Sequence, residues 1–323
     1  MEWTPRLPWD DVPATVRAVV EERLGGRVVS AEPTVGGFSA GFAGIVTSSR
    51  RSFFVKATSA VLNEHGRELY RRERRVCQLL ADHGAGAGLR WSADVGDWTV
   101  LGFDVVEGHI YDPGWAEDRE LDEVLEALAA RRAPAPPGLA PLGEVLDDLF
   151  AAWGALAADA SFDAWPDPGH AAVDRPVFWC GLADRARAAF AGDELLHADL
   201  RADNLLRTPQ GPVLVDWAYA CRGHGAFDPV YLLLEVARTR GSAPDAALER
   251  VVRSFGCDAD DATSLLASFD GWFTWMSRQP PVPALPGLRA FQTEMSAAAR
   301  SWVRDRLAAP LSRPLVEEVP ADA

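Results

Sequence analysis

Residues 195–218 read LLHADLRADNLLRTPQGPVLVDWA, and this stretch decides the fold. A polar loop separates two short apolar pairs, and a third apolar run ends at Asp216. The polar side chains of the loop are His197, Asp199, Arg201 and Asn204. Short apolar runs separated by a turn are typical of a hairpin, which would return Asp216 toward the loop.

The order Asp, Asn and Asp indicates one kind of chemistry. Asp199 would orient a hydroxyl group, while Asn204 and Asp216 would hold Mg²⁺ on the phosphates of a nucleotide. Mg²⁺ prefers oxygen ligands and keeps several waters, so one or two protein groups per ion are sufficient. The stretch therefore predicts a phosphoryl-transfer site.

The stretch resembles the catalytic loop of the aminoglycoside phosphotransferase family, the small-molecule branch of the protein-kinase-like fold. The family pattern is His-Gly-Asp-Leu-His-x-x-Asn, followed by a hydrophobic strand that ends in Asp-Trp or Asp-Phe. This chain has His197-Ala198-Asp199-Leu200-Arg201-Ala202-Asp203-Asn204, and then Val215-Asp216-Trp217. In protein kinases a lysine, and in this family often a histidine, occupies the position of Arg201, which we expect to neutralise the γ-phosphate.

The resemblance implies an α+β, bilobal, protein-kinase-like fold. Residues 1–107 would form the nucleotide-binding N-lobe, a small antiparallel β-sheet with one main helix. Residues 108–323 would form a larger, mostly helical C-lobe with the catalytic loop and the acceptor-substrate pocket. The resemblance covers residues 30–240 well and the rest poorly.

Lys56 is the only lysine in the chain, and the other 31 basic residues are arginine. A compact point charge that must fit between phosphates is one task for which lysine differs from arginine. Lys56 lies in an apolar run that predicts a strand, and it resembles the lysine that holds the α- and β-phosphates in kinases. Residues 63–81 predict a helix whose apolar face includes Glu73, so Glu73 is the expected partner of Lys56, with Glu68 and Glu64 as alternatives.

Two further segments predict contacts with the nucleotide. Residues 35–41, VGGFSAG, form a Gly-rich turn between two expected strands, where Gly37 and Ser39 could approach phosphates closely. Residues 103–108 fit the family's hinge between lobes, so the backbone groups of Asp104 and Val106 are candidates for adenine binding by position. The expected cofactors are ATP, or GTP, and Mg²⁺.

Composition and charge narrow the possible partners. With 323 residues, 48% of them hydrophobic and 24% charged, the chain can bury a sizeable core. Residues 1–107 carry 13 Lys+Arg against 14 Asp+Glu, whereas residues 108–323 carry 19 against 33. This acidity argues against nucleic acid and favours a cationic substrate, although a solvated acidic surface would look the same. No protein partner is implied.

The sequence also predicts a cytoplasmic location. No segment approaches the length of an apolar membrane span, and the first residues do not resemble a signal peptide. The cysteines are far apart without metal-ligand spacing, so we expect free thiols. They are Cys77, Cys180, Cys221 and Cys257.

Together these patterns predict a phosphotransferase that moves the γ-phosphate of ATP or GTP to a hydroxyl of a small, cationic molecule, such as an aminoglycoside or related antibiotic. A metabolic kinase for an amino alcohol, amino acid or sugar is the alternative, as is a non-catalytic nucleotide-binding relative. Ala198 and the short segment after Asp216 argue against a protein kinase. Residues 270–276, which are rich in aromatic side chains, predict either a wall of the acceptor pocket or a core stripe.

Overall fold

The computed structural model describes residues 6–34, 40–83, 88–112, 114–115, 118–167 and 174–308. Its N-terminal part is a five-stranded antiparallel sheet in the order β1-β2-β3-β5-β4. The strands are β1 (Val28–Pro33), β2 (Phe42–Ser48), β3 (Ser52–Ser59), β4 (Leu89–Val95) and β5 (Trp98–Phe103). This is the antiparallel sheet that the resemblance implied.

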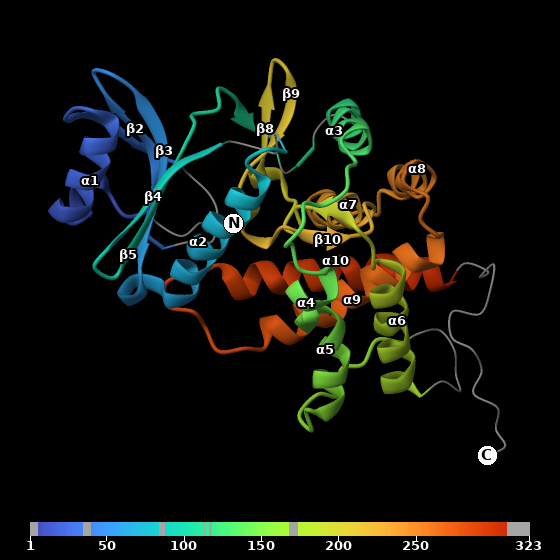
Figure 1. Cartoon of the computed structure of the whole chain (residues 1–323). Coiled ribbons are helices and arrows are strands. Elements are labelled where there is room, and N and C mark those ends of the chain that lie inside the picture. Colours follow the sequence, from blue (N-terminus) through green and yellow to red (C-terminus); the bar gives the residue numbers. More distant parts are fainter. Residues whose placement is uncertain are drawn as a thin grey trace.

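One helix covers each face of this sheet. A short 3₁₀ turn, η1 (Trp9–Asp11), precedes α1 (Ala14–Leu24), which lies on the outer face, and α2 (Ala60–Leu80) lies between the sheet and the rest of the chain (Figure 1). Side chains of a strand alternate between faces. In β3, Val55 and Ala57 therefore pack in the core beneath α1, while Lys56 points to the α2 side.

The remainder is mostly helical (Figure 1). Its helices are α3 (Asp118–Ala130), α4 (Leu142–Val145), α5 (Asp147–Ala158), α6 (Arg175–Ala189), α7 (Phe227–Arg240), α8 (Asp245–Phe255), α9 (Ala259–Ser277) and α10 (Leu288–Ala308). The α9 helix packs against α5, α6 and α10, and every residue of α7 from Phe227 to Ala237 is buried. Its almost continuous apolar sequence accounts for this burial.

Short strands and 3₁₀ turns hold the predicted catalytic stretch on α7. They are β6 (His109–Ile110), β7 (Glu194–Leu196), η2 (Ala202–Asn204), β8 (Leu205–Thr208), β9 (Gly211–Leu214), η3 (Trp217–Tyr219) and β10 (Cys221–Gly223). The β8–β9 hairpin is the one that the apolar runs predicted. Strand β6, which follows the expected hinge, pairs with β8.

Two helices differ from their prediction. The α2 helix starts at Ala60 instead of Asn63, with a kink where Asn63 has non-helical φ and ψ angles. The Asn63 side chain accepts a hydrogen bond from the Gly66 amide at 2.9 Å, and such local bonding competes with the helical pattern. The apolar stripe of residues 142–158 by itself predicts one helix, but the structure breaks it at Leu146 into α4 and α5.

Within the described ranges, no helix is both long enough and apolar enough to cross a bilayer. The four cysteines are free, as predicted, and only Cys221 among them is fully buried.

Candidate active site

Lys56 lies between two carboxylates that come from different parts of the chain. Its Nζ atom lies 2.8 and 2.9 Å from the two carboxylate oxygens of Glu73 and 3.0 Å from Oδ1 of Asp216. Glu73 therefore is the partner predicted for Lys56. Glu68, one of the alternatives, instead pairs with Arg75 on the surface of α2 at 3.2 Å.

The charges of this cluster stabilise one another. Burial alone would lower the pKa of Lys56, but Asp216 and Glu73 raise it well above its ordinary value. Burial opposes ionisation of Asp216, and the nearby Lys56 ammonium outweighs it, so the pKa of Asp216 is lowered. The lysine is thus a fixed cation with Asp216 as a fixed anion beside it.

The hairpin brings Asp216 and Asn204 together. The Val215 amide donates to the Asn204 carbonyl oxygen at 3.0 Å, so Asp216 follows directly on the pairing that ends at Asn204. Asp216 has a φ of +67°, a left-handed conformation that is unfavourable for a residue with a Cβ atom. Strain of this kind is concentrated at functional sites, because the surrounding structure must maintain it.

Asp199 and Asn204 form one unit in the loop. The Asn204 amide nitrogen donates to the Asp199 carbonyl oxygen at 2.8 Å and to its carboxylate at 3.3 Å. The amide oxygen of Asn204 is then the atom that could ligate a cation. Burial raises the pKa of Asp199 to about 7, although the guanidinium of Arg201 acts in the opposite direction.

His197 braces the loop. Its Nε2 atom lies 2.8 Å from the Val215 carbonyl oxygen, and its Nδ1 atom accepts from the Asp199 amide at 3.3 Å. A ring that donates from Nε2 and accepts at Nδ1 is neutral. Burial lowers the pKa of His197 to about 4, so the ring stays neutral at pH 7 and is poorly suited to be a base.

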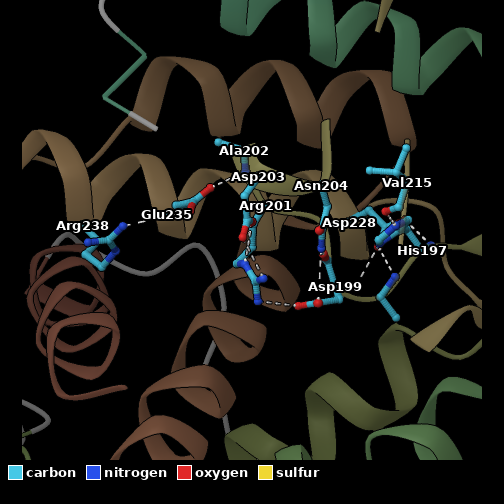
Figure 2. Close-up of polar contacts among 11 residues, drawn as sticks. His197, Asp199, Arg201, Ala202, Asp203, Asn204, Val215, Asp228, Glu235 and Arg238 are labelled. Atoms are coloured by element: carbon cyan, nitrogen blue, oxygen red, sulfur yellow. Dashed lines mark hydrogen bonds and ion pairs between the residues drawn. The ribbon is translucent and has the colours of Figure 1, made fainter. Parts of the chain in front are cut away.

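Two buried carboxylates on α7 hold the catalytic loop (Figure 2). Asp228 accepts from the amides of His197 and Ala198 at 2.7 and 2.8 Å and so braces the loop. Glu235 accepts from the Ala202 amide at 2.7 Å. Sequence reasoning missed Glu235, although a second acid seven residues after Asp228, on the same face of an apolar helix, was a usable signal.

The profile of the phosphotransferase enzyme family matches residues 36–266, more than half of the chain. The chain belongs to this family. No curated protein matches the phosphotransferase in sequence. The match covers the Gly-rich segment, Lys56, the catalytic loop and α7 in one continuous stretch.

Solved structures share the fold of the phosphotransferase at low identity. A choline/ethanolamine kinase family protein from Mesorhizobium loti is 15% identical, with a TM-score of 0.56 over 90% of this chain and 98% of that chain. A putative fructosamine-3-kinase from Haemophilus somnus 129PT is 11% identical, with a TM-score of 0.55 over 91% and 96%. The amicoumacin kinase hAmiN, in complex with AMP-PNP, Ca²⁺ and Ami, is 11% identical, with a TM-score of 0.50 over 85% and 88%. The phosphotransferase thus has the protein-kinase-like fold of small-molecule kinases.

The metal ligands expected in the phosphotransferase fit a nucleotide-bound cation. Within the described part of the chain, no group of three or more His, Cys, Asp or Glu side chains could hold a metal by itself. Mg²⁺ does not need such a cage, because phosphate oxygens and waters complete its coordination. The Asn204 amide and the Asp216 carboxylate are oxygen donors held side by side by the hairpin, as that arrangement requires.

The two residues expected to contact adenine lie directly after the sheet. Asp104 and Val106 follow β5, which ends at Phe103. The Asp104 amide donates to the Gly88 carbonyl oxygen at 3.1 Å, and its carboxylate pairs with Arg90 at 2.7 Å. Of the Asp104 backbone groups, the carbonyl oxygen is therefore the candidate for a nucleotide. Gly37 and Ser39 lie outside the described residues.

The aromatic segment of α9 belongs mainly to the core. Phe273 is buried, and Trp272 and Trp275 pack against the same core from its edge. Asp270 is fully buried and accepts from Ser296 at 2.9 Å and Arg300 at 3.0 Å. Arg300 neutralises the Asp270 carboxylate. Asp270 therefore links α9 to α10 and is not an open site for a cationic acceptor.

Proposed function

We propose that the chain transfers the γ-phosphate of ATP, or GTP, to a hydroxyl of a small, cationic molecule such as an aminoglycoside or a related antibiotic, and so takes part in antibiotic resistance. The observation that carries the proposal is the convergence of Lys56 on Glu73 and Asp216, next to the loop that holds Asp199 and Asn204. This arrangement supplies a cation for phosphates, oxygen ligands for a metal and a carboxylate for the acceptor.

Each residue has a distinct part in this proposal. Lys56, oriented by Glu73, would bind the α- and β-phosphates. Asn204 and Asp216 would bind Mg²⁺, which would neutralise charge on the phosphates. The Asp199 carboxylate would accept a hydrogen bond from the acceptor hydroxyl and take its proton. Gly37 and Ser39 would cover the phosphates, and the Asp104 carbonyl and Val106 amide would bind the adenine edge.

We place the boundary between the nucleotide-binding N-lobe and the acceptor-binding C-lobe at residues 107 and 108. The sheet ends at Phe103, and β6, which pairs with the catalytic hairpin, begins at His109. The fold supports this division because the core under α1 and the main helical core are separate clusters. The cytoplasm, where ATP is abundant, remains our predicted location.

The charge distribution supports a cationic acceptor, and a metabolic kinase is the second candidate. Residues 108–323 carry 33 acidic against 19 basic side chains. Proteins of similar fold include a choline/ethanolamine kinase family protein and a fructosamine-3-kinase. A choline-like or amine-bearing acceptor would be attracted by the same acidic lobe.

A screen with Asp199→Asn tests the function. Aminoglycosides, macrolides, amino alcohols and sugars are incubated with MgATP, and products are identified by a mass gain of one phosphoryl group. We expect Asp199→Asn to bind MgATP as the unaltered protein does and to lose transfer by at least about 100-fold. Asp193→Asn, which removes an exposed carboxylate, is the matched control. Undiminished transfer by Asp199→Asn would remove Asp199 from its assigned part.

A further inference from the structure

The guanidinium of Arg201 is bound to carboxylates of its own loop (Figure 2). Its Nε and Nη2 atoms donate to the two oxygens of Asp203 at 3.0 and 3.2 Å, a bidentate arrangement. Its Nη1 atom donates to Oδ1 of Asp199 at 3.0 Å. A bidentate pair fixes the plane of a guanidinium, so Asp203 determines where Nη1 points.

Asp199 is consequently held from two sides. Arg201 binds Oδ1, and the Asn204 amide donates to Oδ2 at 3.3 Å. Each carboxylate oxygen retains a second lone pair, so both can still accept from an acceptor hydroxyl. The two donors restrict the rotation of the carboxylate, and a fixed orientation of a reacting group is worth more to catalysis than strong basicity in phosphoryl transfer.

The support of Arg201 continues into α7. The Ala202 amide, between Arg201 and Asp203, donates to Glu235, which is 5% exposed. Glu235 lies 4.0 Å from Arg238, and Arg238 reaches Glu294 on α10 at 3.0 Å. Figure 2 shows the contact of Glu235 with Ala202 and that of Arg201 with Asp199. The turn that carries Asp203 is thus fixed to the helical core.

If the Arg201 guanidinium turned away to face the γ-phosphate, this arrangement would break. The Arg201 and Asp203 side chains are only 13% and 15% exposed. If the guanidinium moved to a phosphate, the largely buried Asp203 carboxylate would lose both of its hydrogen bonds from Arg201. Separating a buried ion pair is strongly unfavourable, because one charge is left without compensation.

We propose that Arg201 is a positioning residue: held by Asp203 and supported by Glu235, it orients the Asp199 carboxylate toward the acceptor hydroxyl and does not bind the nucleotide phosphates. This inference rests on the proposed function of Asp199. It replaces our sequence-based expectation that Arg201 neutralises the γ-phosphate. Asp203 becomes a second positioning residue, one step further from the chemistry.

The test uses Arg201→Gln, Asp203→Asn and the double variant, with Asp199→Asn as reference. MgATP binding is measured by calorimetry, and the rate is that of slow ATP hydrolysis by water at saturating MgATP, which needs no identified acceptor. We expect Arg201→Gln to lower this rate about tenfold while the dissociation constant of MgATP changes by less than about threefold. The double variant should be no slower than Arg201→Gln, because Asp203 acts through Arg201.

Three outcomes would overturn the inference. One is a dissociation constant that rises tenfold in Arg201→Gln with an unchanged saturating rate, which would indicate a phosphate contact. A second is an unchanged rate and affinity with a lower melting temperature, which would indicate a purely structural part. The third is a double variant whose loss of rate equals the combined losses of Arg201→Gln and Asp203→Asn. If Arg201→Gln does not fold, Asp203→Asn and Arg201→Lys give the same comparison, with intermediate rates expected because one ion pair is kept.

The reference and control separate this inference from the proposed function. If Asp199→Asn hydrolyses ATP as fast as the unaltered protein, or if the unaltered protein does not bind MgATP, the proposed function fails. If Asp199→Asn is slow and Arg201→Gln is not, only the inference about Arg201 fails. Arg222→Gln, which removes an exposed arginine paired with Asp193 at 2.8 Å, should change neither rate nor affinity.

Discussion

The Nζ atom of Lys56 lies 3.0 Å from Oδ1 of Asp216, which joins strand β3 to the segment that follows β9. Glu73, which lies on α2 and is 1% exposed, completes the cluster at 2.8 Å. The sheet, its inner helix and the catalytic hairpin therefore meet at one ammonium group. We expect both stability and catalysis to depend on this contact, and substitutions can separate the two.

Replacement of Lys56 by Met should unfold the protein more easily and abolish transfer. Glu73 would remain buried without its partner, and breaking a buried pair costs about 3–5 kcal/mol. Protonation limits this loss, because burial raises the pKa of Glu73 and the Lys56 ammonium, which lowers that pKa, is absent from the variant. The free energy of unfolding, measured in urea at pH 8, should fall by about 2–3 kcal/mol.

The double variant Lys56→Met/Glu73→Leu is the matched control for that loss. It replaces the pair with apolar side chains of similar volume, which is often neutral or stabilising, so most of the lost stability should return. Transfer should not return, because no cation remains for the phosphates. A double variant that transfers phosphate would contradict the assigned part of Lys56.

Removal of the metal should reduce the stabilisation of the protein by ATP. A ligand at about 100 times its dissociation constant stabilises a protein by about 2.7 kcal/mol, so MgATP should raise the melting temperature measurably. ATP with excess EDTA should raise it less. In Asp216→Ala and Asn204→Ala the two conditions should become similar, whereas in Asp203→Asn the Mg²⁺-dependent difference should persist. Equal shifts with Mg²⁺ and EDTA in the unaltered protein would argue against a metal site.

Local patterns predicted those parts of the structure that depend on periodicity. The alternation in β3 placed Lys56 on one face, and the stripe of α2 placed Glu73 opposite it. The apolar helix after Asp228 was expected to be buried, and α7 is. Such features follow from spacing along a single element, which the sequence displays directly.

Other contacts between side chains were not predicted. Arg201 and Asp203 are two residues apart, a spacing at which side chains do not face each other in a regular helix. Their pairing follows from the 3₁₀ turn η2, whose position depends on Glu235. Asp270 was a candidate for a pocket because it lies beside aromatic residues, but Arg300 on α10 neutralises it. The sequence contains all these residues without indicating which of them meet.

Ala198 occupies the position at which the family pattern has glycine. Its φ of +59° lies in the left-handed region, which glycine adopts without steric cost, and this explains the glycine of the pattern. The left-handed conformation costs a residue with a Cβ atom about 1–2 kcal/mol. Ala198→Gly removes this strain but adds about 0.4–1 kcal/mol of entropy to the unfolded chain, so stability should change little. Ala198→Val, with a β-branched side chain at a buried position, should lose about 2 kcal/mol or more.

Urea unfolding of these two variants checks the strain argument, and transfer rates check its consequence for the loop. Ala198→Gly keeps the amide that donates to Asp228 at 2.8 Å, so it should retain activity. Equal losses of stability in Ala198→Gly and Ala198→Val would show that the position is not strained.

Protonation of His197 should destabilise the protein in acid. Burial lowers the pKa of His197 from 6.5 to about 4, so the folded state holds the neutral ring while the unfolded chain takes up a proton below pH 6.5. The contribution of the neutral His197 ring to the free energy of unfolding is complete above pH 6.5 and is lost as the pH falls to about 4. The difference of about 2.5 between the two pKa values corresponds to about 3 kcal/mol. Geometry agrees, because a proton on Nδ1 would face the Asp199 amide hydrogen.

The measurement compares the unaltered protein with His197→Gln, whose side-chain amide can still donate to the Val215 carbonyl oxygen but does not titrate. The comparison is needed because burial raises the pKa of Asp228 to about 6, and such carboxyls stabilise the fold as the pH falls. These groups are common to both proteins and cancel in the difference. The difference in unfolding free energy should fall by about 3 kcal/mol between pH 7 and pH 4. Parallel pH profiles of the two proteins would mean that His197 is protonated in the folded state, and the neutral brace between Asp199 and Val215 would have to be abandoned.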